Sequence, residues 1–298
     1  MKIAHISDIH YITPKERNPL KYINKRITGL LNLVFVRSRI HNPLLLDLAL
    51  NKIRQNADVL AVTGDLTNLA FDSEFCAVRK TLNKYFDDDK MLIVPGNHDR
   101  YLKKTITEKT FEKHFGTPHA KDTDNPWPFL KIIDDCAFIG VDSVIDFPPF
   151  YSAGKISRTQ IKIIKQWLQS EQLKDKNKIL LLHHHPVRNL NSPGEHFRKL
   201  RNNNELLKIA KRFNINLILH GHNHTFKCNI HHNTLIAENG SLTVAKHKNP
   251  EKLGRFTIYT FNNNEIIIDT WKYNPKENDF LPGESYAFNN ATLSEIYK

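Results

Sequence analysis

Short apolar runs alternate with longer amphipathic segments from the start of the chain to about residue 220. The apolar runs predict strands at residues 2–7, 58–63, 91–94, 137–142, 178–182 and 216–219. Apolar residues at helical spacing predict helices at residues 44–55, 73–86, 105–115, 157–172 and 205–213. This alternation is typical of an α/β protein with buried strands, whose polar residues gather in the loops at the strand ends.

The pattern changes in the last quarter of the chain. Strands are predicted at residues 235–237, 255–261 and 265–273 without helices between them, and the last two form a hairpin around three asparagines. The tail from Asn274 onward is polar with scattered aromatic residues, and we expect it to run irregularly over the surface. With no internal repeat and no low-complexity linker, a single domain over residues 1–298 is the simplest interpretation.

Residues 11–43 form an insertion that is both apolar and basic. Its apolar residues follow helical spacing: Tyr22, Ile23, Ile27, Leu30, Leu31 and Val34. Its basic residues surround that stripe: Lys21, Lys25, Arg26, Arg37 and Arg39. The pattern fits a segment that lies on an anionic membrane through residues 19–40 or binds an amphiphilic substrate. It equally fits a surface helix that packs on the protein's own core.

The charge favours anionic partners. Lys and Arg outnumber Asp and Glu by 43 to 31, which gives a formal charge of +12. Phosphorylated metabolites, nucleic acid and acidic membranes all fit such a charge, and so does AT-rich coding that inflates lysine. Three widely spaced cysteines predict no disulfide framework. The early charges at the N-terminus and the lack of a long apolar run predict a cytoplasmic protein, with contact at the inner face of the membrane as an alternative.

Metal-ligand residue types directly follow five of the predicted strands. The five blocks are Asp8-x-His10, Gly64-Asp65, Gly96-Asn-His-Asp99, His183 and Gly221-His-Asn-His224. Carboxylate, imidazole and amide ligands together suit manganese, iron or zinc, and the glycines allow sharp turns beside them. If the backbone stays extended, the side chains of Asp8 and His10 project to the same side. The recurrence predicts a metal centre at the strand ends.

These five blocks, in this order and spacing, resemble the calcineurin-like metallophosphoesterase superfamily from Asp8 to His224. The resemblance implies a four-layer α-β-β-α sandwich with two divalent ions (Mn, Fe or Zn) at the strand ends. It implies two groups of ligands and one bridge: Asp8, His10 and His224 for one ion, Asn97, His183 and His222 for the other, and Asp65 between them. His184 and His185 are expected to orient neighbours or to pack.

The implied chemistry is hydrolysis of a phosphoester by water that two metal ions activate. The resemblance makes His98 the general acid for the leaving oxygen, with Asp99 orienting its ring. A scaffold without catalytic activity is the alternative, and the seven intact ligand positions together with His98 argue against it.

The substrate is left open between several phosphoesters. The Asn-His-Asp block and the run from His183 to Pro186 resemble bacterial cyclic-nucleotide phosphodiesterases. The basic apolar insertion is instead closer to relatives that act on UDP-2,3-diacylglucosamine in lipid A synthesis. A nuclease is a third interpretation because the chain is basic. No segment with interleaved aromatic and basic residues for stacking single strands is evident, so nucleic acid is not an expected partner.

Overall fold

The computed structural model describes residues 1–13, 26, 37–116, 126–146, 151–187, 194, 197–262, 265–289 and 292–296. Most of the insertion at residues 11–43, including its apolar stripe, lies outside the described residues. Arg26 and the segment from Arg37 onward are described. Part of the loop expected at residues 121–128 also lies outside.

The larger sheet has seven strands in the order β13-β12-β11-β10-β1-β2-β3. Its parallel part consists of β1 (Lys2–Ile6), β2 (Val59–Thr63) and β3 (Met91–Val94). Its antiparallel part consists of β10 (Arg255–Asn262), β11 (Glu265–Asn274), β12 (Asp279–Asn289) and β13 (Thr292–Ile296). The first strand therefore joins the two parts, because Ile3 pairs with Val59 on one side and with Tyr259 on the other.

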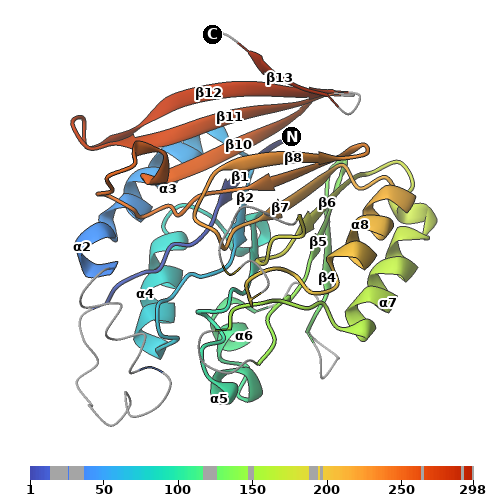
Figure 1. Cartoon of the computed structure of the whole chain (residues 1–298), viewed down its shortest axis with the longest axis horizontal. Helices are drawn as coiled ribbons and strands as arrows, with labels where there is room; N and C mark the ends of the chain where they lie inside the picture. Colours follow the sequence, from blue (N-terminus) through green and yellow to red (C-terminus); the bar gives the residue numbers. More distant parts are fainter. Residues whose placement is uncertain are drawn as a thin grey trace.

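The smaller sheet has six strands in the order β4-β5-β6-β7-β9-β8. Its central strands are parallel: β5 (Cys136–Gly140), β6 (Asn177–Leu181), β7 (Leu217–His220) and β9 (Thr234–Glu238). Its edges are antiparallel: β4 (Phe129–Ile133) and β8 (Lys227–His231). The two sheets lie next to each other (Figure 1), and the loops after β1 and β9 meet, because Ser7 and Ser241 form an isolated parallel bridge.

Helices cover the outer face of each sheet. Figure 1 shows α3 (Leu44–Asn56) and α4 (Asp72–Leu82) on one side and α7 (Arg158–Leu168) and α8 (Asn203–Arg212) on the other, with both sheets between them. Three shorter helices complete the described set: α2 (Ser38–Ile40), α5 (Lys103–Thr107) and α6 (Thr110–Phe115). The four-layer α-β-β-α sandwich expected from the resemblance is therefore confirmed.

Alternating side chains of the smaller sheet serve two cores. Ile179 and Leu181 of β6 pack in the core that the two sheets share. Leu180 and Leu182 belong instead to the core beneath α7 and α8, together with residues such as Ile164. Successive side chains of a strand point to opposite faces, so a strand covered on both faces must be apolar throughout. This explains why the runs before His183 and His220 are continuously apolar.

The structure corrects the expected course of the C-terminal tail. Residues 279–289 and 292–296 are strands of the larger sheet, whereas the sequence suggested an irregular surface segment. Pro282 and Gly283 interrupt the alternation of β12, and the pairing with β11 shifts register between Asp269 and Trp271, opposite that interruption. A bulge of this kind allows a strand near the edge of a sheet to contain proline and glycine. Because these two residues interrupt the apolar alternation, the strand is difficult to recognise in the sequence.

Other differences are smaller. The helix predicted at residues 105–115 is two helices, because Lys109 adopts a left-handed backbone with φ 50° between them. The helix predicted at residues 73–86 ends at Leu82. The edge strands β4 and β8 were not predicted. Each has only five residues, and most of their side chains are partly buried or exposed, so no clear apolar run marks them.

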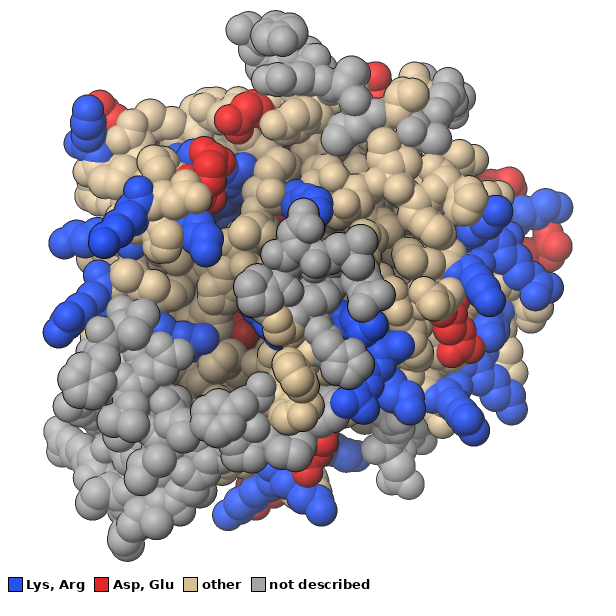
Figure 2. Space-filling model, viewed as in Figure 1, with Lys and Arg blue, Asp and Glu red and all other residues tan. Residues whose placement is uncertain are grey.

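Basic side chains are spread over the surface. Figure 2 shows Lys and Arg along two borders of the viewed face, with fewer acidic side chains among them. Among the described residues, no helix combines the length and the apolar character that crossing a bilayer requires.

Truncating a buried side chain of β12 tests whether the tail is part of the fold. Phe280 is fully buried, with its ring 5.3 Å from that of Phe256 and 5.7 Å from that of Tyr273. We expect Phe280→Ala to lower the free energy of unfolding by about 3–5 kcal/mol, since it leaves a cavity in the core. The neighbouring Leu281 is 36% exposed, and Leu281→Ala should cost less than about 1 kcal/mol. Urea unfolding measures both, and equal losses would contradict the placement of β12.

Candidate active site

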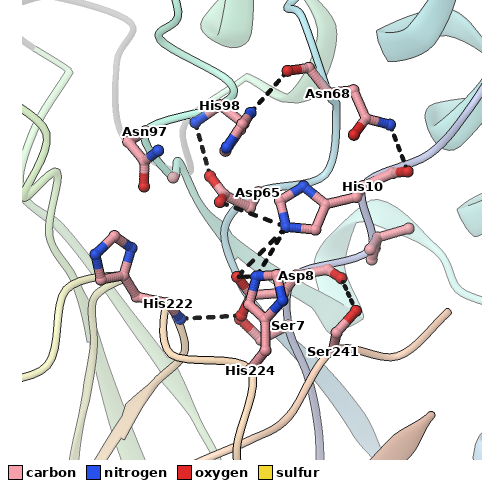
Figure 3. A network of polar contacts seen from close by, with 12 residues as sticks. Ser7, Asp8, His10, Asp65, Asn68, Asn97, His98, His222, His224 and Ser241 are labelled. Atoms are coloured by element: carbon pink, nitrogen blue, oxygen red, sulfur yellow. Dashed lines mark hydrogen bonds and ion pairs between the residues drawn. The ribbon is translucent and has the colours of Figure 1, made fainter. Parts of the chain in front are cut away.

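The predicted site residues meet where the loops of the two sheets come together (Figure 3). The loop after β1 is held against the loop after β2, because the backbone N–H of Asp8 donates to the carbonyl of Gly64 at 3.0 Å. The smaller sheet is tied in the same way, since the N–H of Gly221 donates to the carbonyl of His183 at 3.1 Å. The parallel strands of two sheets thus deliver their polar residues to one place.

Several of these side chains stand on left-handed backbone. The φ angles are 51° at Asp8, 46° at His10, 54° at Asp65, 84° at His222 and 57° at His224. The prediction that Asp8 and His10 sit on extended backbone is therefore wrong. Left-handed backbone costs a residue with a side chain about 1–2 kcal/mol, so the surrounding contacts must hold these residues in place. Such local strain is concentrated at functional sites.

The first expected group of ligands is assembled. The Nε2 atom of His224 lies 3.2 Å from Oδ1 of Asp8, and the Nε2 atoms of His10 and His224 are 3.0 Å apart. The Nε2 atom of His10 is 3.8 Å from Oδ1 of Asp8. Atoms bound to one tetrahedral ion at about 2.1 Å would lie about 3.4 Å from one another. These three side chains therefore have the spacing that a shared ion needs.

The second expected group lies on the other side of Asp65. The Nε2 atom of His183 is 3.2 Å from Oδ1 of Asn97 and 3.1 Å from Nδ1 of His222. The Oδ2 atom of Asp65 lies 3.5 Å from Nε2 of His183 and 3.8 Å from Nε2 of His10. Asp65 therefore faces both groups, which is the arrangement expected of a bridging ligand.

The electrostatics of the site suit bound cations. Asp8 is fully buried, and Nε2 of His224, at 3.2 Å, is the nearest donor to its Oδ1 atom among the described residues. Burial opposes ionisation of Asp65, but the neighbouring His183 and His98 outweigh it and lower its pKa. Burial likewise opposes charge on His183, but Asp65 and Asp8 raise its pKa to about 9. Two buried carboxylates close to each other are costly even beside imidazole rings, and divalent ions held by carboxylate, imidazole and amide donors would remove that cost.

Close packing at two glycines keeps the carboxylate of Asp65 in place. Gly64 has a φ of 87°, and a side chain there would collide with the backbone of Gly96. A side chain at Gly96 would in turn collide with the carboxylate of Asp65. The glycines beside the ligands therefore permit the approach of β2 and β3 that the site requires.

Asp99 has a different role from the one expected. Its carboxylate accepts hydrogen bonds from the backbone N–H groups of Gly96 and Thr67, both at 2.9 Å, and of Leu66 at 3.2 Å. None of its hydrogen bonds within the described residues goes to the ring of His98. The prediction that Asp99 orients this ring is therefore wrong. Asp99 is a positioning residue that fixes the loop after β2 to the loop after β3.

The ring of His98 is held by other groups. Its Nδ1 atom lies 2.7 Å from the carbonyl oxygen of Asn68, so Nδ1 carries the proton. Its Nε2 atom faces a guanidinium nitrogen of Arg37 at 3.1 Å. Burial and the charge of Arg37 together lower the pKa of His98 to about 4 in the protein without metal ions. The backbone N–H of His98 donates to Oδ1 of Asp65 at 2.7 Å, which couples this loop to the bridge.

Arg37 is a site residue that sequence reasoning placed only in the insertion. Its Nη1 atom lies 2.9 Å from Oδ1 of Asn68 and 3.1 Å from Nδ1 of His10. Together with its contact to His98, this places the end of the insertion directly over the metal ligands. The sequence did contain a signal, since Arg37 was one of the basic residues that flank the apolar stripe.

Further residues that sequence reasoning missed hold the ligands in place through hydrogen bonds. The hydroxyls of Ser7 and Ser241 donate to Oδ2 and to the carbonyl oxygen of Asp8, at 2.7 and 2.6 Å. The buried Glu238 accepts from Asn223 at 3.3 Å and from Thr225 at 3.1 Å, on either side of the ligand His224. Ser241 and Glu238 lie at the end of β9, so the strand-end rule that found the other blocks could also have found this one.

The two remaining histidines of the run pack around a ligand. The ring of His184 lies 4.7 Å from the ring of His222, and the ring of His185 stacks on it at 5.9 Å. The Nδ1 atom of His184 lies 2.8 Å from the hydroxyl of Ser143, which holds the ring in place.

A pocket of about 360 Å³ opens above the site, and Asp65, Asn97, His98, His222 and His224 form its floor.

Comparison with protein-family models finds the calcineurin-like phosphoesterase model over residues 1–226. Among curated proteins, the chain is similar to a "Probable cyclic nucleotide phosphodiesterase" of Vesicomyosocius okutanii. The two are 26% identical over 217 residues, which cover 72% of this chain and 82% of that protein.

Solved structures share the fold at low sequence identity. A purple acid phosphatase from yellow lupin (Lupinus luteus) seeds superposes with a TM-score of 0.64 and 11% identity, covering 97% of this chain. The chain spans 53% of the length of that phosphatase. A dimetal phosphatase from Danio rerio superposes with a TM-score of 0.61 and 10% identity, covering 97% of this chain and 98% of that one.

Replacing the bridge should weaken both metal ions together. Asp65→Asn keeps the shape of the side chain but removes the charge that faces both ligand groups. We expect the affinity for each of two manganese ions to fall by more than about 10-fold. Loss of a residue that only hydrogen-bonds a metal ligand already lowers metal affinity by about 10-fold or more. Calorimetric titration with manganese chloride measures both equivalents.

Asn97→Ala is the matched control, since Asn97 contacts only the group that contains His183. This variant should weaken mainly one ion. If Asp65→Asn also weakens only one, Asp65 is not the bridge.

Proposed function

The chain belongs to the calcineurin-like phosphoesterase family and is a hydrolase of phosphoesters. We propose that its substrate is UDP-2,3-diacylglucosamine, whose phosphoanhydride bond water would break to give UMP and the diacylglucosamine 1-phosphate. The proposal includes two divalent ions, manganese first among them, on the seven ligand residues. It also includes peripheral contact with an anionic membrane through residues 19–40, most of which lie outside the described residues.

The residues of the site suit this chemistry. Two ions held on either side of Asp65 would supply an activated water and would offset the charge that grows at phosphorus. His98 lines the pocket, and its Nε2 atom is directed away from the Asn68 carbonyl that fixes the ring. Because Nε2 accepts from Arg37 in this structure, His98 delivers a proton to a leaving oxygen only after Nε2 is protonated and the substrate replaces the contact with Arg37. Asp99 and Asn68 hold the loops that carry His98.

The observation that favours the lipid substrate is the position of Arg37. This residue lies near the end of the basic, apolar insertion and contacts both His10 and His98. A diacylated nucleotide needs apolar surface for its chains next to cations for its phosphates, and the insertion combines both in sequence. Its last residues lie at the pocket, so the insertion is attached to the place where the phosphate reacts.

A cyclic-nucleotide phosphodiesterase is the second candidate. It is favoured by the similarity to the curated Vesicomyosocius okutanii protein, which covers most of both chains. A pocket of about 360 Å³ is also large enough for a small nucleotide.

A substrate panel separates the candidates. Purified protein with manganese is incubated with UDP-2,3-diacylglucosamine, cyclic AMP or single-stranded DNA, and the products are separated by chromatography. We expect release of UMP from the UDP-lipid and none from Asp65→Asn, because that variant lacks the bridging charge. Cleavage of cyclic AMP alone would replace the lipid proposal by the second candidate.

Removing the His98 ring tests its role in proton transfer. We expect His98→Ala to retain both manganese ions and to lose about 100-fold or more in kcat on a substrate with a poor leaving group, as loss of a general acid does. The loss should be smaller for bis-p-nitrophenyl phosphate, whose leaving group needs no proton. Equal losses on both substrates would argue that His98 only supports the site's structure.

A further inference from the structure

The pocket is lined by basic side chains from three separate segments. Arg37 comes from near the end of the insertion, Arg198 from the segment before Leu200, and His247 and Lys252 from the connection between β9 and β10. We call Arg37, Arg198 and Lys252 the cationic rim. Among the described residues that line this pocket, Asp65 on the floor is the sole carboxylate.

Among the described residues, no carboxylate is hydrogen-bonded to either arginine of the rim. The hydrogen bonds of Arg37 go to neutral acceptors, the side chains of Asn68, His10 and His98. The Nη2 atom of Arg198 donates to the backbone carbonyl of His222 at 3.2 Å. Both guanidinium groups are thus anchored beside the metal ligands while their charge remains available to a ligand.

Lys252 is also without an acidic partner among the described residues. The adjacent Glu251 is already engaged by Arg255, at 3.0 Å, and by Lys272. The position of Lys252 is nevertheless defined, because it ends a single 3-10 turn, η6 (Pro250–Lys252), that the side chain of Asn249 caps by accepting from the N–H of Glu251.

The charge of the rim exceeds what one phosphodiester needs. The carboxylates of Asp8 and Asp65 offset half the charge of two divalent ions. A single phosphodiester carries one negative charge and would lie on those ions. The two partly buried arginines of the rim would then have no counter-charge from the described residues in the filled pocket, and partly dehydrated cations of one sign repel each other. The exposed Lys252 adds a third positive charge next to them. A substrate with a second anionic group removes this imbalance.

We propose that the cationic rim binds a second phosphate of the same substrate, next to the phosphate that reacts, so that the preferred substrate is a diphosphate diester. This inference rests on the proposed function, since it assumes that the first phosphate lies at the metal ligands. It gives Arg198 and Lys252 a role in selecting the substrate. It also discriminates between the two candidates, because a cyclic nucleotide monophosphate has no second phosphate to offer.

Two ligands that differ by one phosphate test the proposal. UDP-glucose and the methyl ester of UMP share the nucleoside, and each is added as a competitor of bis-p-nitrophenyl phosphate hydrolysis by the manganese-loaded enzyme. We expect UDP-glucose to inhibit at lower concentration. In Lys252→Gln its inhibition constant should rise about 10-fold, as loss of a charge-assisted hydrogen bond would produce, against no more than about 2-fold for the methyl ester. Arg198→Gln should show the same preference for affecting UDP-glucose.

Lys248→Gln is the matched control, because Lys248 is exposed on the same connection but does not line the pocket. It should leave both inhibition constants unchanged. Equal effects of Lys252→Gln on both ligands, or no effect on either, would overturn the proposal. So would binding of inorganic phosphate as tight as that of UDP-glucose, since the rim would then be a site for free anions.

Failure of this inference can be told apart from failure of the proposed function. If the wild-type protein does not hydrolyse bis-p-nitrophenyl phosphate with manganese, the proposed function fails. Calorimetric titration of the metal-free full chain with UDP-glucose and with the methyl ester then still measures the affinity of the cationic rim for each ligand. If the diester is hydrolysed but Lys252→Gln does not discriminate between the two ligands, only the inference about the second phosphate fails.

Discussion

Two buried carboxylates at the junction of two sheets set the conditions for the rest of the structure. Asp8 and Asp65 are removed from water, where an ionised carboxylate is costly unless cations and donors surround it. The groups that surround them come from β1, β2, β3, β6 and β7, so both sheets must be correctly packed before the charges are compensated. The left-handed backbone at the ligands and the glycines at close contacts follow from the same requirement.

The sequence alone predicted those strands whose apolar pattern matches their burial in the fold. Strands buried on both faces, such as the one before His183, are continuously apolar and end at a polar block, so both their position and their site residues could be predicted. The four-layer arrangement and the ligand set came from the resemblance that these blocks carry. Periodicity alone does not specify how two sheets face each other.

Other features lay beyond the sequence because they depend on contacts between distant residues. Nothing local to Asp99 shows that its carboxylate binds the backbone of Leu66 and Thr67 rather than the neighbouring ring. Arg37 is one basic residue among several in its segment, and only the fold brings its guanidinium to His98. The strand β12 was missed because Pro282 and Gly283 break its alternation, and the register shift that accommodates them is a property of the paired sheet.

The central position of β1 has a consequence for how the protein is made. The strand is synthesised long before β10, which is one of its neighbours, so that Lys2 pairs with Thr260. The serine that holds the carbonyl of Asp8 also arrives late, at position 241. Loop closure over such a separation is slow, and an unpaired strand edge is exposed meanwhile. The metal site, although four of its seven expected ligands lie within the first 100 residues, can be completed only after Ser241 and the strand β10 have left the ribosome.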